Sequence, residues 1–405
     1  MRKQKHDEKA NPSKIKLISI VSLLFGFTDA LLVYVLSAYF REVSGTENVS
    51  FLYLIAFCIV LAALFHLHGV IRKVGKSMLL FLLLITAIVA NATLILMDPS
   101  WFTIAVLLVH LVVSNLVWVS LDIILESFSE DGKSGRIRGL YLTIVNAGWL
   151  LAPLLSVTLL ARSGFSGIFF VGLVMYSIIL VIALLGLRRV NHRFKEMITP
   201  RQILRKVRLR KDVLRIYAVA LAVEFFYAVM VVYMSLYLLN LGFGWREIGM
   251  IFSVMLIPFV VIQYPLGVLA DKRFGEKEML IFFLALMVIS TAWLPFIVSE
   301  KVWFWAAALF VTRIGAAGVD ILRDSYFYKR IGPSDVDIIA FFRTARPVAN
   351  ILAAVVVGVS LLFFPLASVF FIAAFVLFLG LIPAFLLVDN AAERESDDFA
   401  AQMEV

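Results

Sequence analysis

Twelve long apolar runs constrain this chain more than any other feature of its sequence. They cover approximately residues 15–40, 49–68, 78–97, 101–126, 136–161, 165–187, 214–240, 246–270, 278–298, 302–326, 336–362 and 365–388. A helix needs about 20 mostly apolar residues to cross the hydrocarbon core of a bilayer. Hydrophobic residues make up 62% of the 405 positions, whereas soluble domains contain about 45–50%. The sequence therefore predicts an all-α integral membrane protein with twelve transmembrane helices.

Lysine and arginine are distributed unevenly between the predicted loops. If the N-terminus lies inside the cell, 29 of the 37 Lys and Arg residues fall in inside segments and 4 fall in outside loops. Cytoplasmic loops carry such an excess of positive charge, and the inner leaflet that they face is anionic. We therefore expect a multi-pass protein of the cell membrane with both termini in the cytoplasm. We assign the net charge of +9 to contact with membrane lipid rather than with nucleic acid.

The two halves of the chain resemble each other when one is shifted by 198 positions. The shift places "DIILES" (122–127) on "DILRDS" (320–325), so that Asp122 meets Asp320 and Glu126 meets Asp324. Both copies lie in the fourth helix of a set of six, so matched helices run in the same direction. Such a parallel repeat is typical of two bundles related by a pseudo-two-fold axis along the membrane normal. Transporters of this kind place the substrate path between the two bundles.

The repeat and the longest polar stretch define the expected domains. Residues 1–187 form the first six-helix bundle with a cytoplasmic N-terminus, and residues 214–405 form the second bundle with an acidic cytoplasmic tail. Residues 188–213 form a basic cytoplasmic linker, in which "ITPRQILRKVRLRK" alternates apolar and basic residues. This alternation is typical of an amphipathic helix on the membrane surface; a solvated linker is the alternative.

Four of the predicted helices carry polar or aromatic residues on one face, at spacings of three, four or seven positions. The members are Asn115, Trp118, Asp122 and Glu126; Asn146, Trp149 and Pro153; Arg313, Asp320 and Asp324; and Arg343, Arg346 and Asn350. Residues at these spacings share a face of a helix. An ionisable side chain inside a span costs about 2.5–3.5 kcal/mol. We therefore expect these faces to turn toward an aqueous cavity inside the protein.

The charged residues near the predicted cytoplasmic helix ends form a first group. We assign these residues to a cytoplasmic gate: Asp122, Glu126, Arg138, Asp320, Asp324, Arg343 and Arg346, with Arg136 and Arg323 at the same depth. Opposite charges at one depth predict ion pairs that close the cytoplasmic side. Contact with substrate is the alternative for this group.

A second group lies nearer the middle of the membrane and consists of Asp29, Glu224 and Arg313. A low-dielectric environment favours the neutral form of a carboxyl group, so Asp29 and Glu224 are candidates for proton coupling. The alternative is that one of them neutralises Arg313 as a buried pair. An unpaired Arg313 could instead hold an anionic substrate through its planar guanidinium. The remaining candidates for the cavity lining are Tyr34, Asn91, Asn115, Trp118, Asn146, Tyr227, Tyr233, Gln263 and Asn350.

The short stretch "GVLADKRFGEK" (267–277) lies in the cytoplasmic loop between the eighth and ninth runs. It resembles the loop signature of the major facilitator superfamily, Gly-x-x-x-Asp-(Arg/Lys)-x-Gly-(Arg/Lys)-(Arg/Lys). The residues that match are Gly267, Asp271, Lys272, Gly275 and Lys277, with one extra residue before Gly275 and with Glu276 in a basic position. The first-half copy "HGVIRKVGK" has Arg72 where the acid should be. The resemblance implies the fold of that superfamily and a two-position latch at the second-half loop.

Motifs of enzymes and pumps are missing from the sequence. It contains no P-loop, no dinucleotide-binding loop, no Ser-His-Asp arrangement and no His spacing suited to a metal. Its single cysteine is Cys58. We therefore expect no enzyme, no cofactor and no metal site. We expect instead a monomeric secondary transporter of a small molecule, driven by a proton or other ion gradient through alternating access.

The substrate class is left open by the sequence. An acid on the first helix of an aromatic cavity slightly favours efflux of lipophilic or cationic compounds. Uptake or exchange of a sugar or organic anion is the alternative if Arg313 is unpaired. A lipid flippase, a membrane enzyme and a receptor or scaffold that has lost transport are the other classes considered.

Overall fold

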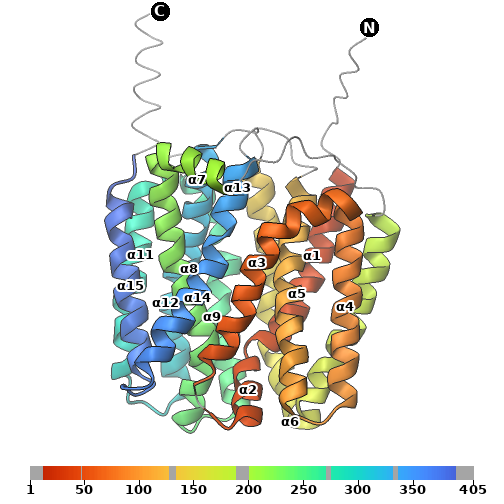
Figure 1. Cartoon of the computed structure of the whole chain (residues 1–405). Helices are drawn as coiled ribbons and strands as arrows, with labels where there is room; N and C mark the ends of the chain where they lie inside the picture. The colour runs from red at the N-terminus through yellow and green to blue at the C-terminus, as the bar shows by residue number, and fades with distance from the viewer. Residues whose placement is uncertain are drawn as a thin grey trace, which may run out of the picture.

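The computed structural model describes residues 12–46, 48–126, 134–187, 200–270, 275–331 and 336–388, and within these ranges the chain is helical and contains no strand. The helices are α1 (Pro12–Val33), α2 (Leu36–Ser44), α3 (Ser50–Val74), α4 (Lys76–Leu96), α5 (Trp101–Glu126), α6 (Ser134–Gly186), α7 (Pro200–Leu209), α8 (Lys211–Asn240), α9 (Trp245–Val261), α10 (Gln263–Leu269), α11 (Lys277–Trp293), the 3₁₀ turn η2 (Leu294–Phe296), α12 (Val302–Lys329), α13 (Val336–Arg343), α14 (Ala345–Ser360) and α15 (Ser368–Phe385). They stand side by side as a membrane bundle (Figure 1).

The described helices provide twelve crossings, as the sequence predicts. Ten continuous helical segments are long and apolar enough to span a bilayer, and α3 adds a shorter apolar segment, Ser50–Leu64. The long segment Thr143–Gly186 contains two crossings, because the chain reverses direction at Gly164. Gly164 has φ 61° and ψ −160°, a backbone conformation that residues with a Cβ avoid. The all-α fold with twelve spans is therefore confirmed.

Three spans are interrupted in the described part of the chain: between α1 and α2, between α9 and α10, and between α13 and α14. The break between α13 and α14 falls at Thr344, three residues before Pro347. Proline has no N–H for the carbonyl of Arg343 four positions earlier, and its ring crowds that carbonyl. The break between α1 and α2 frees the carbonyl of Leu31, which accepts a hydrogen bond from the Ser156 hydroxyl of α6. A side chain inserted into the helical ladder in this way is a recognised cause of helix distortion.

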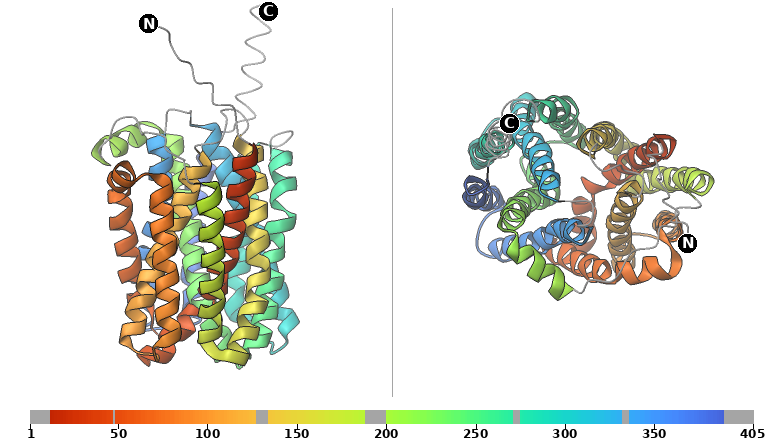
Figure 2. Two further views of the ribbon diagram at one scale, coloured as in Figure 1. Left: turned by 90° about the vertical axis from the view of Figure 1, so that its right-hand side faces the viewer. Right: turned by 90° about the horizontal axis from the view of Figure 1, so that it is seen from above.

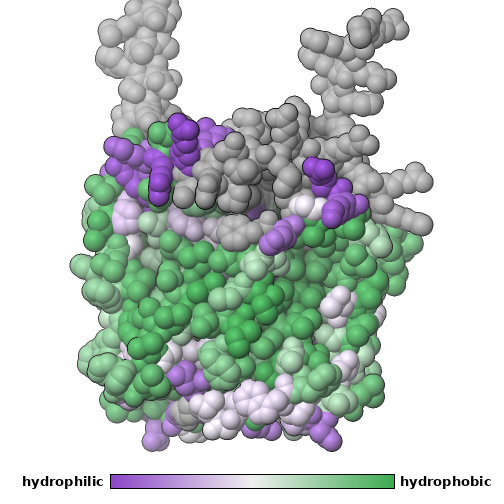
Figure 3. Space-filling view, viewed as in Figure 1, coloured by the Kyte–Doolittle hydropathy of each residue, from purple (hydrophilic) through white to green (hydrophobic). Residues whose placement is uncertain are grey.

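The outer surface of the bundle is apolar around its middle and polar at its ends. Figure 3 shows a broad hydrophobic belt, with hydrophilic residues concentrated at the side where α1 begins and α15 ends. We call this side the terminal side and the opposite one the far side. Large apolar residues such as Phe282, Phe375 and Val89 are more than half exposed, which is expected where lipid replaces water. The structure is thus that of a multi-pass membrane protein.

The chain folds into two groups of helices that lie next to each other (Figure 2). Helices α3 and α14 pack together, as do α6 and α9, and these two pairs join the groups. On the far side the contact is very close, because a Cβ added to Gly358 would lie 3.0 Å from the Cβ of Ser50. A Cβ added to Gly249 would lie 2.8 Å from a methyl carbon of Val157. The two halves are therefore packed tightly against each other on the far side.

Helix α7 lies on the terminal side, roughly across the direction of the spanning helices (Figures 1 and 2). It confirms that the basic linker contains a helix, although residues 188–199 fall outside the described part of the chain. Val207 is buried and Leu209 is exposed at the end of the helix. Location at the membrane surface stays a prediction.

Candidate functional site

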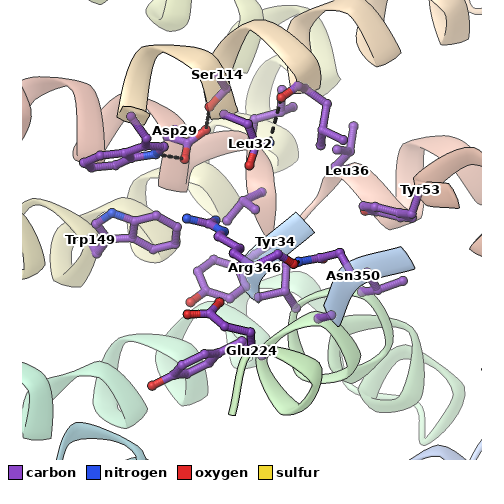
Figure 4. Close-up of a pocket in the computed structure, with 18 of the residues that line it drawn as sticks. Asp29, Leu32, Tyr34, Leu36, Tyr53, Ser114, Trp149, Glu224, Arg346 and Asn350 are labelled. Atoms are coloured by element: carbon purple, nitrogen blue, oxygen red, sulfur yellow. Dashed lines mark hydrogen bonds between the residues drawn. The ribbon is translucent and has the colours of Figure 1, made fainter. Parts of the chain in front are cut away.

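A central cavity of about 270 Å³ lies between the two halves. Its polar and charged lining comes from α1, α5 and α6 of the first half and from α8, α12 and α14 of the second half: Asp29, His110, Ser114, Asn115, Asn146, Glu224, Arg313, Asp320, Arg346 and Asn350. Aromatic rings complete the walls, namely Tyr34, Tyr53, Phe57, Trp118, Trp149, Tyr227 and Phe259. Figure 4 shows Asp29 and Glu224 on opposite sides of this space, with Arg346 between them. The polar helix faces therefore meet at one internal cavity.

Asp29 is held by neutral donors in the wall of the cavity. The indole Nε1 of Trp118 donates to its carboxylate at 2.9 Å, and the hydroxyl of Ser114 donates to the other oxygen (Figure 4). Ser114 and Trp118 are four residues apart on α5 and so share one face of that helix. Among the described residues no cation lies within ion-pair distance of Asp29. Asp29 therefore lines the cavity without an ion-pair partner among the described residues.

A cluster of acids surrounds Arg323 on the terminal side of the cavity. The guanidinium lies 3.3 Å from a carboxylate oxygen of Glu224, 3.6 Å from Asp320 and 3.0 Å from Asp324. The hydroxyl of Tyr227 also donates to Asp320 at 2.8 Å. Glu224 is thus paired with Arg323 rather than with Arg313. Arg323 holds three carboxylates together within the second half.

Arg313 is buried, with only 2% of its surface exposed, and it lines the cavity. Its guanidinium carbon lies 5.3 Å from the ring centre of Phe226 and 5.5 Å from that of Tyr227. Its Nε atom is buried without a hydrogen-bond partner, and no described carboxylate lies within ion-pair distance of it. The sequence left open whether Asp29 or Glu224 neutralises Arg313, and in the described chain neither forms an ion pair with it.

The two arginines of the eleventh span have different surroundings. Arg343 forms an ion pair with Asp122 of α5, and this pair joins the two halves on the terminal side of the cavity. Arg346 lies about one turn deeper, beyond the break at Thr344, and it points into the cavity (Figure 4). The sequence grouped Arg346 and Asp320 with the gate, but the structure places both in the cavity lining. The reason is depth, because each lies one helical turn farther from the terminal side than Arg343 or Asp324.

Some predicted lining residues instead make contacts beyond the cavity wall. Among the described lining residues are Tyr34, Asn115, Trp118, Asn146, Tyr227 and Asn350, whereas Asn91, Tyr233 and Gln263 are absent from that lining. Tyr233 is hydrogen bonded to Ser50 across the halves, and Asn146 donates to Gln263 at 2.9 Å, also across the halves. Asn91 is buried beside His110, with 3.4 Å between their nitrogen atoms. Tyr233 and Gln263 therefore join the halves rather than face the cavity.

The loop that carries the family signature is partly described. Gly267 lies in α10, and Gly275 has φ 68°, a conformation that favours glycine. Asp271 and Lys272 lie outside the described residues, as do the side chains of Glu126 and Arg138. Their proposed gating contacts stay predictions. Glu276, which departs from the signature, is fully buried, pairs with Lys329 and accepts a hydrogen bond from Ser325 at 2.9 Å.

Sequence reasoning missed the roles of Arg323, His110 and Glu276. Arg323 was assigned only to the gate, although its position three residues after Asp320 could have indicated an ion pair within one helix. His110 lies four residues before Ser114 on the same face of α5, and it lines the cavity. Glu276 gave no signal beyond its mismatch with the loop signature.

This combination of twelve spans, two packed halves and a charged central cavity is that of a membrane transporter. The family profile described as Major Facilitator Superfamily matches residues 18–255 and 246–402. The chain belongs to the major facilitator superfamily, as the loop resemblance indicated.

Solved structures of transporters have the same fold. One, described as the in meso crystal structure of the POT family transporter PepTSo, has a TM-score of 0.74 at 14% identity and covers 93% of this chain and 98% of its own. Another, an auto inhibited POT family peptide transporter, has a TM-score of 0.71 at 13% identity over 94% and 98% of the two chains. No curated protein matches this sequence. At such low identity the likeness shows the fold alone.

Proposed function

We propose that this protein is a proton-coupled secondary transporter that moves a small molecule through the central cavity by alternating access. It works as a monomer in the cell membrane with its terminal side in the cytoplasm, as the distribution of Lys and Arg indicates. The observation that carries this proposal is the charged cavity lined by both halves. A cavity at the boundary of two repeats can face either side when one repeat rotates against the other.

The contacts between the halves support such a rotation. The Asp122–Arg343 ion pair closes the cytoplasmic side, and the contact between Ser50 and Gly358 closes the outer side. Each contact joins one helix of the first half to one of the second. Opening either side requires its contact to separate while the packing inside each half is kept. The proposed gate thus consists of two sets of contacts on opposite sides of the substrate.

Proton coupling is assigned to Asp29 and Glu224. Asp29 contacts only neutral donors, so uptake of a proton removes a charge from the wall of the cavity. Glu224 pairs with Arg323, so its protonation weakens a contact between α8 and α12. Either event changes the electrostatic balance of the cavity, as a coupled transporter requires. The two carboxylates offer two different ways to link a proton to the conformational change.

The geometry favours the alternative substrate class over the cationic one. Efflux of lipophilic cations is expected where cavity acids are free to attract them. Among the described lining acids only Asp29 is without an ion pair, because Glu224 and Asp320 both contact Arg323. Arg313 has no carboxylate partner among the described residues, which was the condition for transport of a sugar or organic anion. The direction of transport depends on the gradients of the proton and the substrate, and the liposome experiment measures it.

The test uses purified protein in liposomes that contain a pH-sensitive dye. Addition of a broad panel of metabolites to one side should change the internal pH in the presence of the protein. Asp29→Asn and Glu224→Gln should abolish or reduce coupled transport, whereas Asp98→Asn and Glu300→Gln, which make the same changes at exposed carboxylates, should not. Full-rate uphill transport in both cavity variants would rule out these acids as coupling sites. The absence of proton movement with every compound would refute proton coupling.

A further inference from the structure

The cavity holds a buried positive charge that the protein itself does not neutralise by direct contact. Arg313 is 98% buried by its 2% exposure, and Phe226 and Tyr227 cover the guanidinium at ring distances of 5.3 and 5.5 Å. Aromatic faces stabilise a cation but accept no strong hydrogen bonds. The Nε atom has no partner in the described part of the chain. A buried guanidinium is normally paired and hydrogen bonded. Arg313 is an exception, because the described residues supply no acceptor to its Nε atom.

The acids of the cavity already have other partners. Glu224 and Asp320 face Arg323 at 3.3 and 3.6 Å. Asp29 accepts hydrogen bonds from Trp118 and Ser114. These three are the carboxylates in the described cavity lining. The described carboxylates of the cavity lining therefore supply no acceptor to Arg313, and an anionic molecule that enters the cavity can supply one.

A second guanidinium strengthens the case for an anion. Arg346 of α14 also lines the cavity, and no described side chain accepts a hydrogen bond from it or pairs with it. Figure 4 shows it extending into the space between Asp29 and Glu224. Arg313 and Arg346 come from neighbouring spans of the repeat, α12 and α14. The cavity thus contains two guanidinium groups without an ion-pair partner among the described residues. Of its carboxylates, Glu224 and Asp320 contact Arg323, and Asp29 contacts neutral donors.

We infer, on the basis of the transport function proposed above, that the transported molecule is a small organic anion whose carboxylate or phosphate group binds the guanidinium of Arg313. The planar guanidinium matches the two oxygens of either group. The cavity volume of about 270 Å³ lies just below the range of about 300–1,000 Å³ for ligand sites, so the molecule is compact. Tyr34 and Phe259 in the lining provide apolar surface for its body.

Binding to the purified protein tests this inference without any gradient. The probes are benzoate, phenyl phosphate, benzyl alcohol and benzylamine, which share one ring and differ in charge, and the measurements are thermal stabilisation and calorimetry. Benzoate or phenyl phosphate should raise the melting temperature, and the comparison of the two distinguishes a carboxylate site from a phosphate site. Benzyl alcohol and benzylamine should have little effect. Stabilisation by benzylamine above that of both anions, or no response to either anion, would overturn the inference.

Variants of the arginine locate the site. Arg313→Gln should weaken anion binding at least about tenfold, and Arg313→Lys should retain part of it because the charge stays while the planar fork is lost. Without ligand, the melting temperature of Arg313→Gln should not fall, because the variant removes an unpaired buried charge. Arg246→Gln, at an exposed arginine on the far side, is the matched control. Anion affinity that is unchanged in Arg313→Gln would place binding elsewhere and refute the assignment.

The anion-binding experiment and the transport experiment can fail independently of each other. Selective anion binding with no coupled proton movement would leave the ligand class standing and remove proton coupling. Proton-coupled transport of benzylamine, with no anion binding, would leave the transporter standing and remove the ligand class.

Discussion

The ion pair between Asp122 and Arg343 should bias the protein toward the conformation that is closed on the terminal side. It joins α5 to α13, and therefore the first half to the second. The pair is absent in any state in which these helices separate. Asp122→Asn removes its negative charge with little change of shape, and the equilibrium should then shift toward the state that is open on the terminal side.

The size of the shift follows from the burial of the pair. The side chains of Arg343 and Asp122 are 26% and 17% exposed. Exposed pairs contribute about 0–1 kcal/mol, and breaking a fully buried pair costs about 3–5 kcal/mol. A partly buried pair should lie between these limits, at about 1.5 kcal/mol. That energy changes the ratio of open to closed molecules roughly tenfold.

The assay is a double-mutant cycle read by distances between spin labels on the two halves. The labels are placed at Lys73 and Glu278, which are exposed on the terminal side of the first and second halves, in a background with Cys58→Ala. Asp122→Asn and Arg343→Gln should each increase the population with long distances. The double variant should not increase the long-distance population any further, because either substitution alone already breaks the ion pair.

A pair within one half provides the control. Arg215 and Asp212 lie 2.8 Å apart in α8 with similar exposure, 29% and 24%, but they do not join the halves. Asp212→Asn should leave the distance distribution unchanged. Equal shifts in the two sets of variants, or additive effects of Asp122→Asn and Arg343→Gln, would refute the assignment of the pair to the gate.

Three further predictions concern packing and closure. Gly318→Ala should destabilise the protein by about 1–3 kcal/mol despite the better helix propensity of alanine, because the new Cβ would lie 2.4 Å from a ring carbon of Phe283; a melting temperature equal to that of the wild type contradicts this. Ser50→Cys with Gly358→Cys would place the two Cβ atoms 3.0 Å apart, slightly closer than the roughly 3.5–4.5 Å of a disulfide. After a small separation of the two helices the pair should form a reducible bond that stops transport, and full transport by the oxidised protein would exclude opening at this contact. Glu276→Gln should lower the free energy of unfolding by about 2 kcal/mol, a value between the limits for exposed and buried ion pairs. Thermal unfolding measures this change, and an unchanged stability would show that this buried acid contributes little to the loop.

Much of the fold could be read directly from the sequence. The length and spacing of the apolar runs gave twelve spans, because a helix must cross a hydrocarbon layer of fixed thickness. The repeat of Asp122 at Asp320 indicated two related halves, which pack through α3 with α14 and α6 with α9. Spacing alone also predicted that Asn115, Trp118 and Asn146 share one cavity, and all three line it.

The pairing of charges could not be read in the same way. Asp122 and Asp320 occupy matching positions of the repeat, yet Asp122 meets Arg343 of the other half and Asp320 meets Arg323 of its own helix. Helical periodicity fixes the face on which a side chain lies but not which residue of another helix faces it. A difference of one turn, about 5.4 Å, decides whether an arginine such as Arg346 lies in the gate or in the cavity.

Hydrophobic length and helical period are local properties of the chain, so they were enough to predict twelve membrane crossings and polar helix faces turned toward a shared cavity. The packing of the helices, in contrast, brings Glu224, Asp320 and Asp324 together around Arg323 and leaves Arg313 without a carboxylate partner among the described residues. The reason is that ion pairing depends on distances of a few ångströms between separate helices, and these distances are set by how the helices pack.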